Sequence, residues 1–310
     1  MNRQKICVIG MGYIGLPTAA ILATNGYEVI GVDTDSEIVR TLNDCDLHIQ
    51  EPGLKTLAQA AFKSGNLQAK REPEESDVFI IAVPTPLEDV EPDLQYLQSA
   101  SKSVLEYLKV SDLVILESTS PPGTTREEVK PILEESGLKA GKDFYLAHSP
   151  ERVLPGSILQ EMTQNDLVIG AIDRESAEKA KEIYKSFSEG DIYLTDATTA
   201  ELVKVMENTF RDVNIALSNE LSNICREVGA DVWEAIELAN KHPRVNYHRP
   251  GPGVGGHCIP IDPWFIADKA QNNSELIRLS RRLNESQKEV VVDRTEKIVE
   301  EVSEPKVTIL

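Results

Sequence analysis

The sequence has few cysteines, and they lie far apart. Among 310 residues there are four, Cys7, Cys45, Cys225 and Cys258. Because they lack the short spacings of metal ligands, we interpret them as reduced thiols of a cytoplasmic protein and predict no metal site.

Long apolar runs and a leader segment are also lacking. No apolar stretch approaches the roughly 18 residues that would indicate a membrane span. The N-terminus continues directly into a strand-like run and shows no signal-peptide pattern. We therefore predict no membrane association.

Positive charge is scarce. Lysine and arginine number 32 against 51 aspartates and glutamates, so the formal net charge is -19. Nucleic acids and anionic membranes bind basic patches, and this balance argues against both as partners. A phosphorylated ligand is not excluded, because a few arginines and helix N-termini can bind one locally.

What the sequence does contain, in its first two thirds, is an alternation of short apolar runs with helical patterns. The length predicts two domains, or three. Strand-like runs occupy 5–10, 27–33, 77–84, 112–118, 143–148, 166–171 and 191–195, and helical patterns include 18–26, 93–108 and 174–187. Such alternation predicts an α/β fold, a doubly wound (Rossmann) parallel sheet over residues 1–195.

The pattern changes after Asp196. Thr198 and Glu201 have the spacing of a capping box, and a long helix should follow and stop at Gly229. Its apolar residues step by threes and fours, and therefore form one stripe: Met206, Phe210, Val213, Leu217, Leu221, Ile224 and Val228. With a further helical run at 274–302, residues 196–302 are predicted to form an all-helical central domain.

The turn "GMGYIG" at the end of the first strand predicts a dinucleotide site. Gly10 permits the tight turn, Gly12 lets a pyrophosphate approach the backbone, and Gly15 lets the helix pack closely on the strand. Tyr13 and Ile14 lie within the same turn. The alternative is that the glycines serve only the turn.

Asp33 ends the second strand, where a carboxylate would accept hydrogen bonds from the ribose hydroxyls and repel a 2′-phosphate. This favours NAD over NADP, although Asp33 could instead cap the strand. Thr85 and Thr119 follow the third and fourth predicted strands, where ligands bind in open parallel sheets. We predict nicotinamide or ribose contacts for both threonines; turn chemistry alone is the alternative.

On the long helix, Lys204, Asn208 and Arg211 share one narrow face, because each residue turns the helix by ~100°. A cation, an amide and a guanidinium in a row suit an anionic ligand or a developing oxyanion. A solvated helix face would look similar, and Glu201 and Glu207 are interpreted as ordinary charges of that kind.

Cys258 lies in "PGPGVGGHCIPID" (250–262), a stiff loop that presents the thiol rather than packing it. A thiol suits the capture of an aldehyde, because the resulting hemithioacetal can still lose a hydride. Asp262 could orient a lysine or activate water. The alternative for Cys258 is a small buried side chain; Cys7 and Cys225 are predicted to be core residues, and His257 is a weaker candidate base.

Together these residues resemble the nucleotide-sugar 6-dehydrogenases, the family of UDP-glucose and UDP-N-acetylhexosamine dehydrogenases. The similar segments span almost the whole chain in the family's order: "GMGYIGLP" (10–17), "VPTP" (83–86), "STSPPGTT" (118–125), "SPERVLPG" (149–156), "KVMENTFRDVNIALSNE" (204–220) and "GPGVGGHCIPIDP" (251–263). Three segments, "SPERVLPG", "HPRVN" (242–246) and "GGHCIPIDPWFI" (255–266), are most similar to the UDP-N-acetyl-D-mannosamine branch, followed by the N-acetylglucosamine branch.

The resemblance implies a four-electron, NAD-dependent oxidation of the C6 hydroxyl to a carboxylate, with Cys258 as the nucleophile. It implies proton transfer and oxyanion stabilisation by Lys204 with Asn208, and support of the base chemistry by Asp262. It also implies that Thr119 and Glu151 activate water. The implied sugar-nucleotide contacts are Arg152, Val153, Lys204, Asn208, Arg211, His242, Arg244 and Gly255. It further implies a homodimer through the central helix, which the apolar stripe could serve as well as the core.

Two departures from the family bear on the substrate and on the chain's length. The glucose branch has a second glutamate four residues after the position of Glu151, and Pro155 stands there, which favours an N-acetylhexosamine. Residues 303–310 resemble the first strand of the family's C-terminal UDP-binding domain, so we expect a truncated chain. The alternatives are a β-hydroxyacid dehydrogenase, which needs no thiol, or an inactive NAD-binding dimerisation module.

Overall fold

The computed structural model describes residues 4–308. The chain divides into two compact units, and the division falls after Lys204, inside helix α8 (Ala197–Val228). Within the described residues, no helix has both the length and the apolarity of a membrane span.

The first unit is built on a sheet whose described part contains eight strands in the order β10-β9-β8-β7-β4-β1-β2-β3. Their bounds are β1 Lys5–Ile9, β2 Glu28–Val32, β3 Leu67–Lys70, β4 Val78–Ile81, β7 Leu113–Leu116, β8 Tyr145–His148, β9 Leu167–Ala171 and β10 Ile192–Asp196. Neighbouring strands are parallel except β8 and β9, so β9 and β10 run against the others. The predicted, mostly parallel doubly wound sheet is confirmed.

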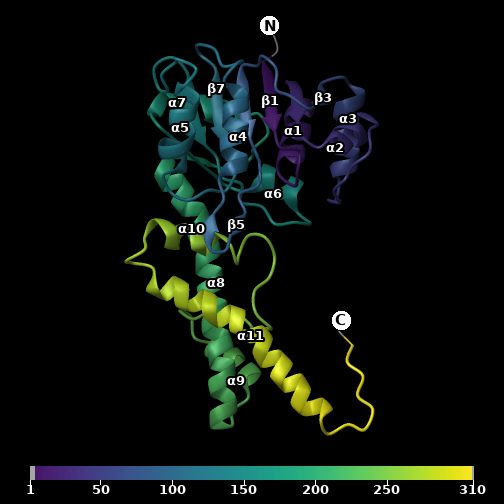
Figure 1. The fold of residues 1–310 in the computed structure, drawn as a ribbon, viewed down its shortest axis with the longest axis vertical. Helices are drawn as coiled ribbons and strands as arrows, with labels where there is room; N and C mark the ends of the chain where they lie inside the picture. The colour runs from purple at the N-terminus through teal and green to yellow at the C-terminus, as the bar shows by residue number, and fades with distance from the viewer. Residues whose placement is uncertain (1–3, 309–310) are drawn as a thin grey trace. The chain divides into compact units, whose positions relative to one another are not determined.

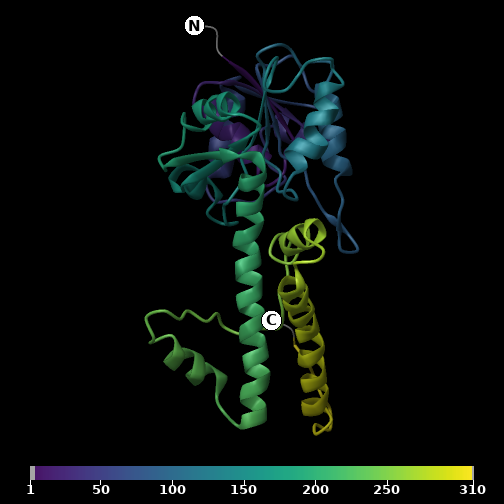
Figure 2. The ribbon, with the colours of Figure 1, turned by 90° about the vertical axis from the view of Figure 1, so that its left-hand side faces the viewer.

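Helices cover both faces of this sheet (Figure 1, Figure 2). They are α1 Gly15–Thr24, α2 Ser36–Asn43, α3 Leu54–Lys63, α4 Gln95–Val104, α5 Lys130–Glu134 with the π-helical turn η1 Thr125–Val129 before it, α6 Ile158–Gln164 and α7 Arg174–Tyr184. Alternate residues of β1 join different cores: Ile6 and Val8 pack with α1, α3 and α7, whereas Cys7 and Ile9 pack with α4 and α5. Successive side chains of a strand point to opposite faces, so each apolar run serves two cores.

The second unit is all-helical in its described elements, as predicted. It contains the remainder of α8, then α9 Val232–Ala239, α10 Asp262–Lys269 and α11 Glu275–Val299. A long segment without helix or strand, residues 240–261, connects α9 to α10 and contains the cysteine loop.

The start of α8 differs from the capping box that the sequence suggested. The carboxylate of Asp196 accepts a hydrogen bond from the Thr199 backbone N–H at 3.1 Å, so Asp196 caps the helix. Glu201, interpreted above as an ordinary surface charge, is only 1% exposed. The capping box of Thr198 and Glu201 and the surface position of Glu201 were both wrong, because the spacing of polar residues does not show which of them is buried.

The apolar stripe of α8 lies mostly at the surface. Met206, Phe210 and Val228 are 52%, 69% and 71% exposed, and Leu217 and Ile224 are also exposed. Cys225, predicted to be core, is only half-buried, while Cys7 is buried as predicted. The stripe therefore does not form the core of this chain along most of its length.

Three short strands were not predicted, and the expected C-terminal strand lies partly outside the described residues. Strand β3 and the small hairpin of β5 (Leu87–Glu88) and β6 (Glu91–Pro92) have little apolar signal in the sequence. The segment from 305 to 308, predicted as a strand, forms none, and Ile309 and Leu310 lie outside the described residues.

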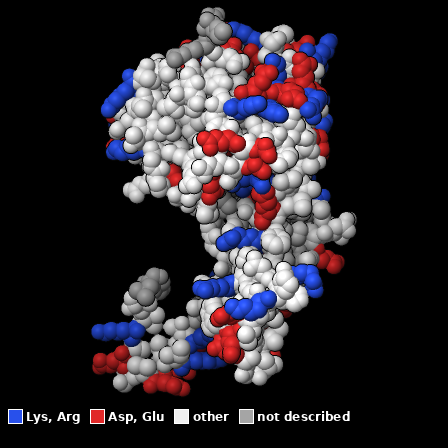
Figure 3. Space-filling view, turned by 180° about the vertical axis from the view of Figure 1, so that it is seen from behind, with Lys and Arg blue, Asp and Glu red and all other residues white. Residues whose placement is uncertain are grey.

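Charges of both signs share the surface. On the face drawn in Figure 3, lysines and arginines lie among aspartates and glutamates. With a net charge of -19, an anionic ligand must be bound by a few local cations rather than by a general positive field.

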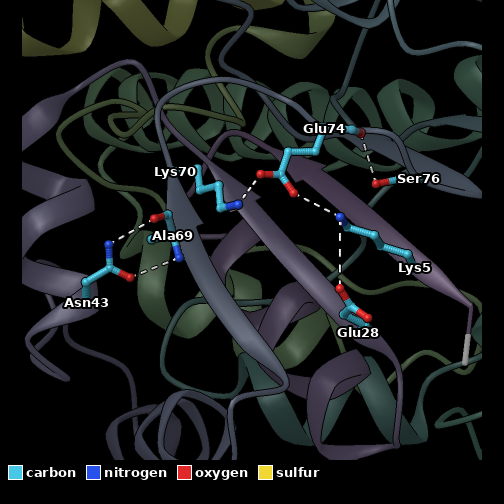
Figure 4. Close-up of polar contacts among 7 residues, drawn as sticks. All are labelled: Lys5, Glu28, Asn43, Ala69, Lys70, Glu74 and Ser76. Atoms are coloured by element: carbon cyan, nitrogen blue, oxygen red, sulfur yellow. Dashed lines mark hydrogen bonds and ion pairs between the residues drawn. The ribbon is translucent and has the colours of Figure 1, made fainter.

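Glu74 fixes the segment between β3 and β4 through ion pairs with Lys5 and Lys70 (Figure 4). Its carboxylate accepts a hydrogen bond from Lys5 Nζ at 2.9 Å and pairs with Lys70 as well, and these lysines, Lys70 first, lower the pKa of Glu74. At the edge strand β3, the Asn43 side chain bonds both polar backbone groups of Ala69, at 2.9 and 3.1 Å. These contacts satisfy backbone groups of the edge strand β3 and join β1 to the segment between β3 and β4.

Candidate active site

The turn after β1 has the backbone geometry that a pyrophosphate site needs. Gly10 has φ +95°, and a Cβ there would lie 2.4 Å from the carbonyl oxygen of Ala82. A Cβ on Gly15 would lie 1.8 Å from the carbonyl oxygen of Gly10. A Cβ on Gly12 would meet nothing within 4 Å, so the space over the turn is open to a ligand. Tyr13 is 53% exposed beside it, and Ile14 is half-buried.

Asp33 follows β2 and faces the same turn. Its Oδ2 accepts a hydrogen bond from the Met11 N–H at 3.0 Å and its Oδ1 accepts one from the Asp35 N–H at 2.9 Å. Asp33 therefore does make the contact at the end of the strand that the sequence analysis offered as the alternative to ribose binding. Each carboxylate oxygen can accept more than one bond, so ribose hydroxyls can still be bound.

Thr85 and Thr119 lie together at the carboxyl ends of β4 and β7. The Thr85 hydroxyl donates to the Thr119 carbonyl oxygen at 2.6 Å, and the Ser118 hydroxyl donates to the Val83 carbonyl oxygen at 2.7 Å. These bonds hold the two strand ends in one arrangement. The turn-chemistry interpretation is thus observed, and a ligand contact by either threonine stays a prediction.

Glu151 follows β8 at the same edge of the sheet. It is half-buried and accepts a hydrogen bond from the Arg152 N–H at 2.6 Å. Burial raises the pKa of Glu151 to about 7, against the lowering effects of that bond and of the Lys204 and Arg152 charges. A carboxyl group of this pKa can exchange a proton near neutral pH.

Arg152 and Val153 continue this loop. The guanidinium of Arg152 donates to the Asp166 carbonyl oxygen at 3.0 Å, and Val153 packs against a small apolar cluster around Ile158. Glu51 closes the loop by accepting from the Gly156 and Ile158 N–H groups, both at 2.9 Å. The loop is therefore held by the protein before any ligand contacts it.

Glu117, at the end of β7, is a buried carboxyl group that the sequence reasoning missed. It is 2% exposed and accepts hydrogen bonds from the hydroxyls of Thr18, at 3.0 Å, and Tyr184, at 2.9 Å. Burial, and then the nearby charge of Glu151, raise the pKa of Glu117 to about 8. Glu117 therefore holds a proton at neutral pH and links β7 to α1 and α7. No sequence motif marks it.

Glu201 was also missed as a functional anchor. Its carboxylate accepts from the N–H groups of Gly123 and Thr125, at 2.5 and 2.7 Å, and from the Thr125 hydroxyl. These residues end the "STSPPGTT" segment. Since Lys204 follows Glu201 on the same helix, the anchor holds the half-buried Lys204 relative to the strand ends of the first unit.

In the second unit, Cys258 is exposed, as the sequence predicted. Its carbonyl oxygen accepts from the Ile261 and Asp262 N–H groups, at 3.0 and 2.9 Å, so the thiol lies in a turn that leads into α10. Asp262 is 3% exposed, and its Oδ2 accepts from the Asn208 amide at 2.6 Å. The structure thus joins the predicted residues Asn208 and Asp262 directly.

The other predicted substrate contacts of the second unit lie at its surface. Arg211, His242, Arg244 and Gly255 are exposed. The Nδ1 of His242 accepts from the Arg244 N–H at 3.4 Å, which gives His242 a local structural contact. Whether these residues bind a ligand stays a prediction.

The N-terminal and C-terminal parts of the chain match two domains of the same family. Residues 4–188 match the UDP-glucose/GDP-mannose dehydrogenase family, NAD binding domain, and residues 198–286 match the central domain of the same family. The chain belongs to this family.

Relatives of this UDP-glucose/GDP-mannose dehydrogenase family member carry similar names. The UDP-N-acetyl-D-mannosamine dehydrogenase of Methanocaldococcus jannaschii is 54% identical over 96% of this chain and 69% of its own length. The NDP-N-acetyl-D-galactosaminuronic acid dehydrogenase of Ralstonia solanacearum is 48% identical over 98% and 74%. The solved structure of the UDP-D-ManNAc dehydrogenase from Pyrococcus horikoshii has a TM-score of 0.92 and 47% identity over 96% and 72%. The chain spans about two thirds of the length of the curated relatives.

The family and the turn geometry agree on the cofactor, which is NAD. The open space at Gly12, the close contacts at Gly10 and Gly15, and the carboxylate of Asp33 fit a dinucleotide with free ribose hydroxyls. Family membership also favours a nucleotide-sugar dehydrogenase over the β-hydroxyacid dehydrogenase considered from the sequence.

Proposed function

We propose that this chain oxidises the C6 hydroxyl of UDP-N-acetyl-D-mannosamine to a carboxylate, through a thioester on Cys258. The observation that carries the proposal is the exposed thiol in a turn anchored to Asp262, whose carboxylate is bonded by Asn208. The names of the relatives and the proline at position 155 favour an N-acetylhexosamine. An N-acetylglucosamine or N-acetylgalactosamine epimer is the alternative substrate.

The turn of Gly10 to Gly15 and Asp33 would hold NAD, which would supply the hydride acceptor for each of two oxidations at C6. In the first, Lys204 accepts the hydroxyl proton as the aldehyde forms. The Cys258 thiolate then adds to the aldehyde carbon, a C–S bond forms, and the carbonyl π-electrons move to oxygen. We assign stabilisation of that oxygen to the Lys204 ammonium and the Asn208 amide.

Loss of the second hydride from the hemithioacetal leaves a thioester on Cys258. Water, activated by Glu151 with Thr119, attacks the thioester carbon; the C–S bond breaks and the thiolate leaves. Asp262 supports the proton transfers through its bond to Asn208. In sum, one alcohol and one water give one carboxylate, with two hydrides removed and three protons released.

We propose that Arg152, Val153, Arg211, His242, Arg244 and Gly255 contact the sugar nucleotide, and that the protein works as a cytoplasmic homodimer. Exposed apolar residues along α8 support the homodimer, because an apolar surface of this extent is typical of an interface. Within the described residues the four cysteines form no disulfide, which supports a reducing compartment.

The test is stoichiometry. The chain is incubated with UDP-N-acetylmannosamine and excess NAD, and the NADH and uronic acid formed are counted. We expect two NADH per acid, and we expect Cys258→Ser to abolish the acid while NAD binding stays within about twofold of the parent value. One NADH per sugar with a carbonyl product would contradict the proposal. Parallel incubations with the N-acetylglucosamine and N-acetylgalactosamine nucleotides decide the epimer.

A further inference from the structure

A buried polar row runs along α8 beyond the residues singled out from the sequence. Asp212 and Asn219 are both 0% exposed, and they follow Asn208 by one and three helical turns. At ~100° per residue, the three side chains lie within about 40° of one another around the helix. Buried polar side chains require partners, so this row must serve a defined contact.

The partners of the row come from α11. Asn284 donates from Nδ2 to the backbone and side-chain oxygens of Asp212, both at 2.9 Å, and its Oδ1 accepts from Asn219 Nδ2 at 2.9 Å. Arg281, 1% exposed, donates to Asp212 Oδ1 at 2.5 Å and to Glu285 at 3.1 Å. These bonds lock the side chain of Asn219 in one orientation, because its amide nitrogen is already committed to Asn284.

The remaining polar atom of Asn219 points to the cysteine loop. Its Oδ1 accepts from the Gly251 N–H at 2.8 Å. Two residues on, Gly253 has φ +119° and lies so close to α11 that a Cβ would be 2.6 Å from the Asn284 carbonyl oxygen. The beginning of the loop is therefore fixed by a side chain of α8 and by the backbone of α11.

We propose that Asn219 is a positioning residue for the nucleophile, because it holds the start of the loop that presents Cys258. Asn208 holds the end of the same loop through Asp262. The inference rests on the proposed function of Cys258 as the nucleophile. Neither Asn219 nor its partner Asn284 belongs to the residues assigned above to catalysis.

The loop needs two anchors because of its composition. Residues 251–258 contain four glycines, and most of this segment is exposed. Glycines lose the most conformational freedom when ordered, so the loop would sample many positions if its start were released. A displacement of about 1 Å at a reacting atom can cost about a hundredfold in rate.

The first test needs no turnover. In the parent chain, the Gly251 amide should exchange with solvent at least about tenfold more slowly than in an unstructured peptide of the same sequence. Asn219→Ser, which keeps a buried polar group but cannot span to Gly251, should lose that protection. It should also change the pH profile of Cys258 alkylation by iodoacetamide. Gly251 exchange at the unprotected rate in the parent chain would overturn the inference.

The second test is kinetic. Asn219→Ser should lower kcat for acid formation by about tenfold or more, with the KM for NAD unchanged. Asn214→Ala is the matched control: this asparagine lies on the same helix but donates to the Phe210 carbonyl oxygen of that helix, so kcat should not change. Equal kcat for Asn219→Ser and the parent would overturn the inference. If the parent forms no acid, the proposed function fails, while amide exchange and alkylation still judge the anchor.

Discussion

Glu117 is a carboxyl group that the fold keeps neutral. Its partners are two hydroxyl groups, those of Thr18 and Tyr184, and the nearby charge of Glu151 is of like sign. The pKa of Glu117, about 8, exceeds that of Glu151, about 7. Glu151, with a pKa of about 7, can exchange a proton near neutral pH.

The raised pKa of Glu117 predicts a pH-dependent effect of Glu117→Gln on stability. Because the folded pKa lies above the unfolded value of about 4.3, the stability that Glu117 contributes is fully present below that pH and is lost as pH rises towards 8. The neutral glutamine has no such loss. Relative to the parent, the variant should gain up to about 1.4 kcal/mol of unfolding free energy per pH unit between pH 5 and 8.

Urea unfolding at pH 5, 6, 7 and 8 measures this difference. Glu106→Gln, a change at an exposed glutamate of the same unit, is the control and should show a flat difference. A flat difference for Glu117→Gln as well would mean that Glu117 is ionised in the folded protein.

The glycines of the turn predict two separable effects. Gly15→Ala would place a Cβ 1.8 Å from the Gly10 carbonyl oxygen, so it should lower the melting temperature even without NAD and also weaken NAD binding. Gly12→Ala places its Cβ in open space, so it should leave the melting temperature unchanged but weaken NAD binding about tenfold or more. Calorimetry with and without NAD distinguishes them. Normal NAD affinity in Gly12→Ala would mean that this glycine serves only the turn.

At the scale of elements, α8 makes buried polar contacts within each of the two units. Glu201 holds its first turns to the 123–125 segment, and Gly170 leaves room for them, since a Cβ there would lie 2.6 Å from Ala200. Further along, Asp212 binds Arg281 and Asn284 of α11. The helix is thereby fixed within each unit by buried polar contacts rather than by its apolar stripe.

The Asp212–Arg281 pair predicts a large stability loss for Arg281→Ala. Both side chains are at most 1% exposed, and burial raises the pKa of Asp212 even though Arg281 opposes that effect. Removing the guanidinium leaves a buried carboxylate without its cation, so the second unit should lose about 3–5 kcal/mol of unfolding free energy. Chemical denaturation measures this. Arg282→Ala, at an exposed neighbour, is the control, and equal small losses for both variants would count against a buried ion pair.

At the scale of the whole molecule, the exposed apolar face of α8 is the feature on which the homodimer proposal rests. Soluble monomers rarely leave a continuous apolar row at the surface of a long helix. Met206, Phe210 and Ile224 form such a row, with exposures of 52%, 69% and 45%. A second copy of the chain, whose α8 presents the same residues, is the occupant that the homodimer proposal requires.

The homodimer proposal predicts that the chain sediments as a dimer and that Phe210→Glu shifts it towards the monomer by about tenfold or more in dissociation constant, because the variant puts a charge into an apolar interface. Sedimentation velocity over a concentration series measures this. Val110→Glu adds the same charge at an exposed apolar residue of the first unit, 64% exposed, and should leave the dimer intact. Identical sedimentation of Phe210→Glu and the parent would reject this face as the interface.

The sequence by itself determined the alternation of most strands of the sheet with helices, the glycine turn after β1, and the exposed cysteine loop, but not strand β3 or the β5–β6 hairpin. These follow from local rules: apolar runs of strand length, glycines where the backbone leaves no room for a Cβ, and a Gly/Pro-rich segment that cannot form a helix. The polar face of α8 was recognised in part, because Lys204 and Asn208 repeat at a helical interval.

Only the tertiary structure decided which polar residues are buried and what they hold. Glu117, Glu201 and Asn219 look like surface residues in the sequence, yet their partners lie 67 to 99, 76 to 78 and 32 to 65 positions away. The apolar stripe of α8 was equally ambiguous, because a core and an interface need the same side chains. Burial depends on which distant segments pack together, and no local pattern of residues contains that information.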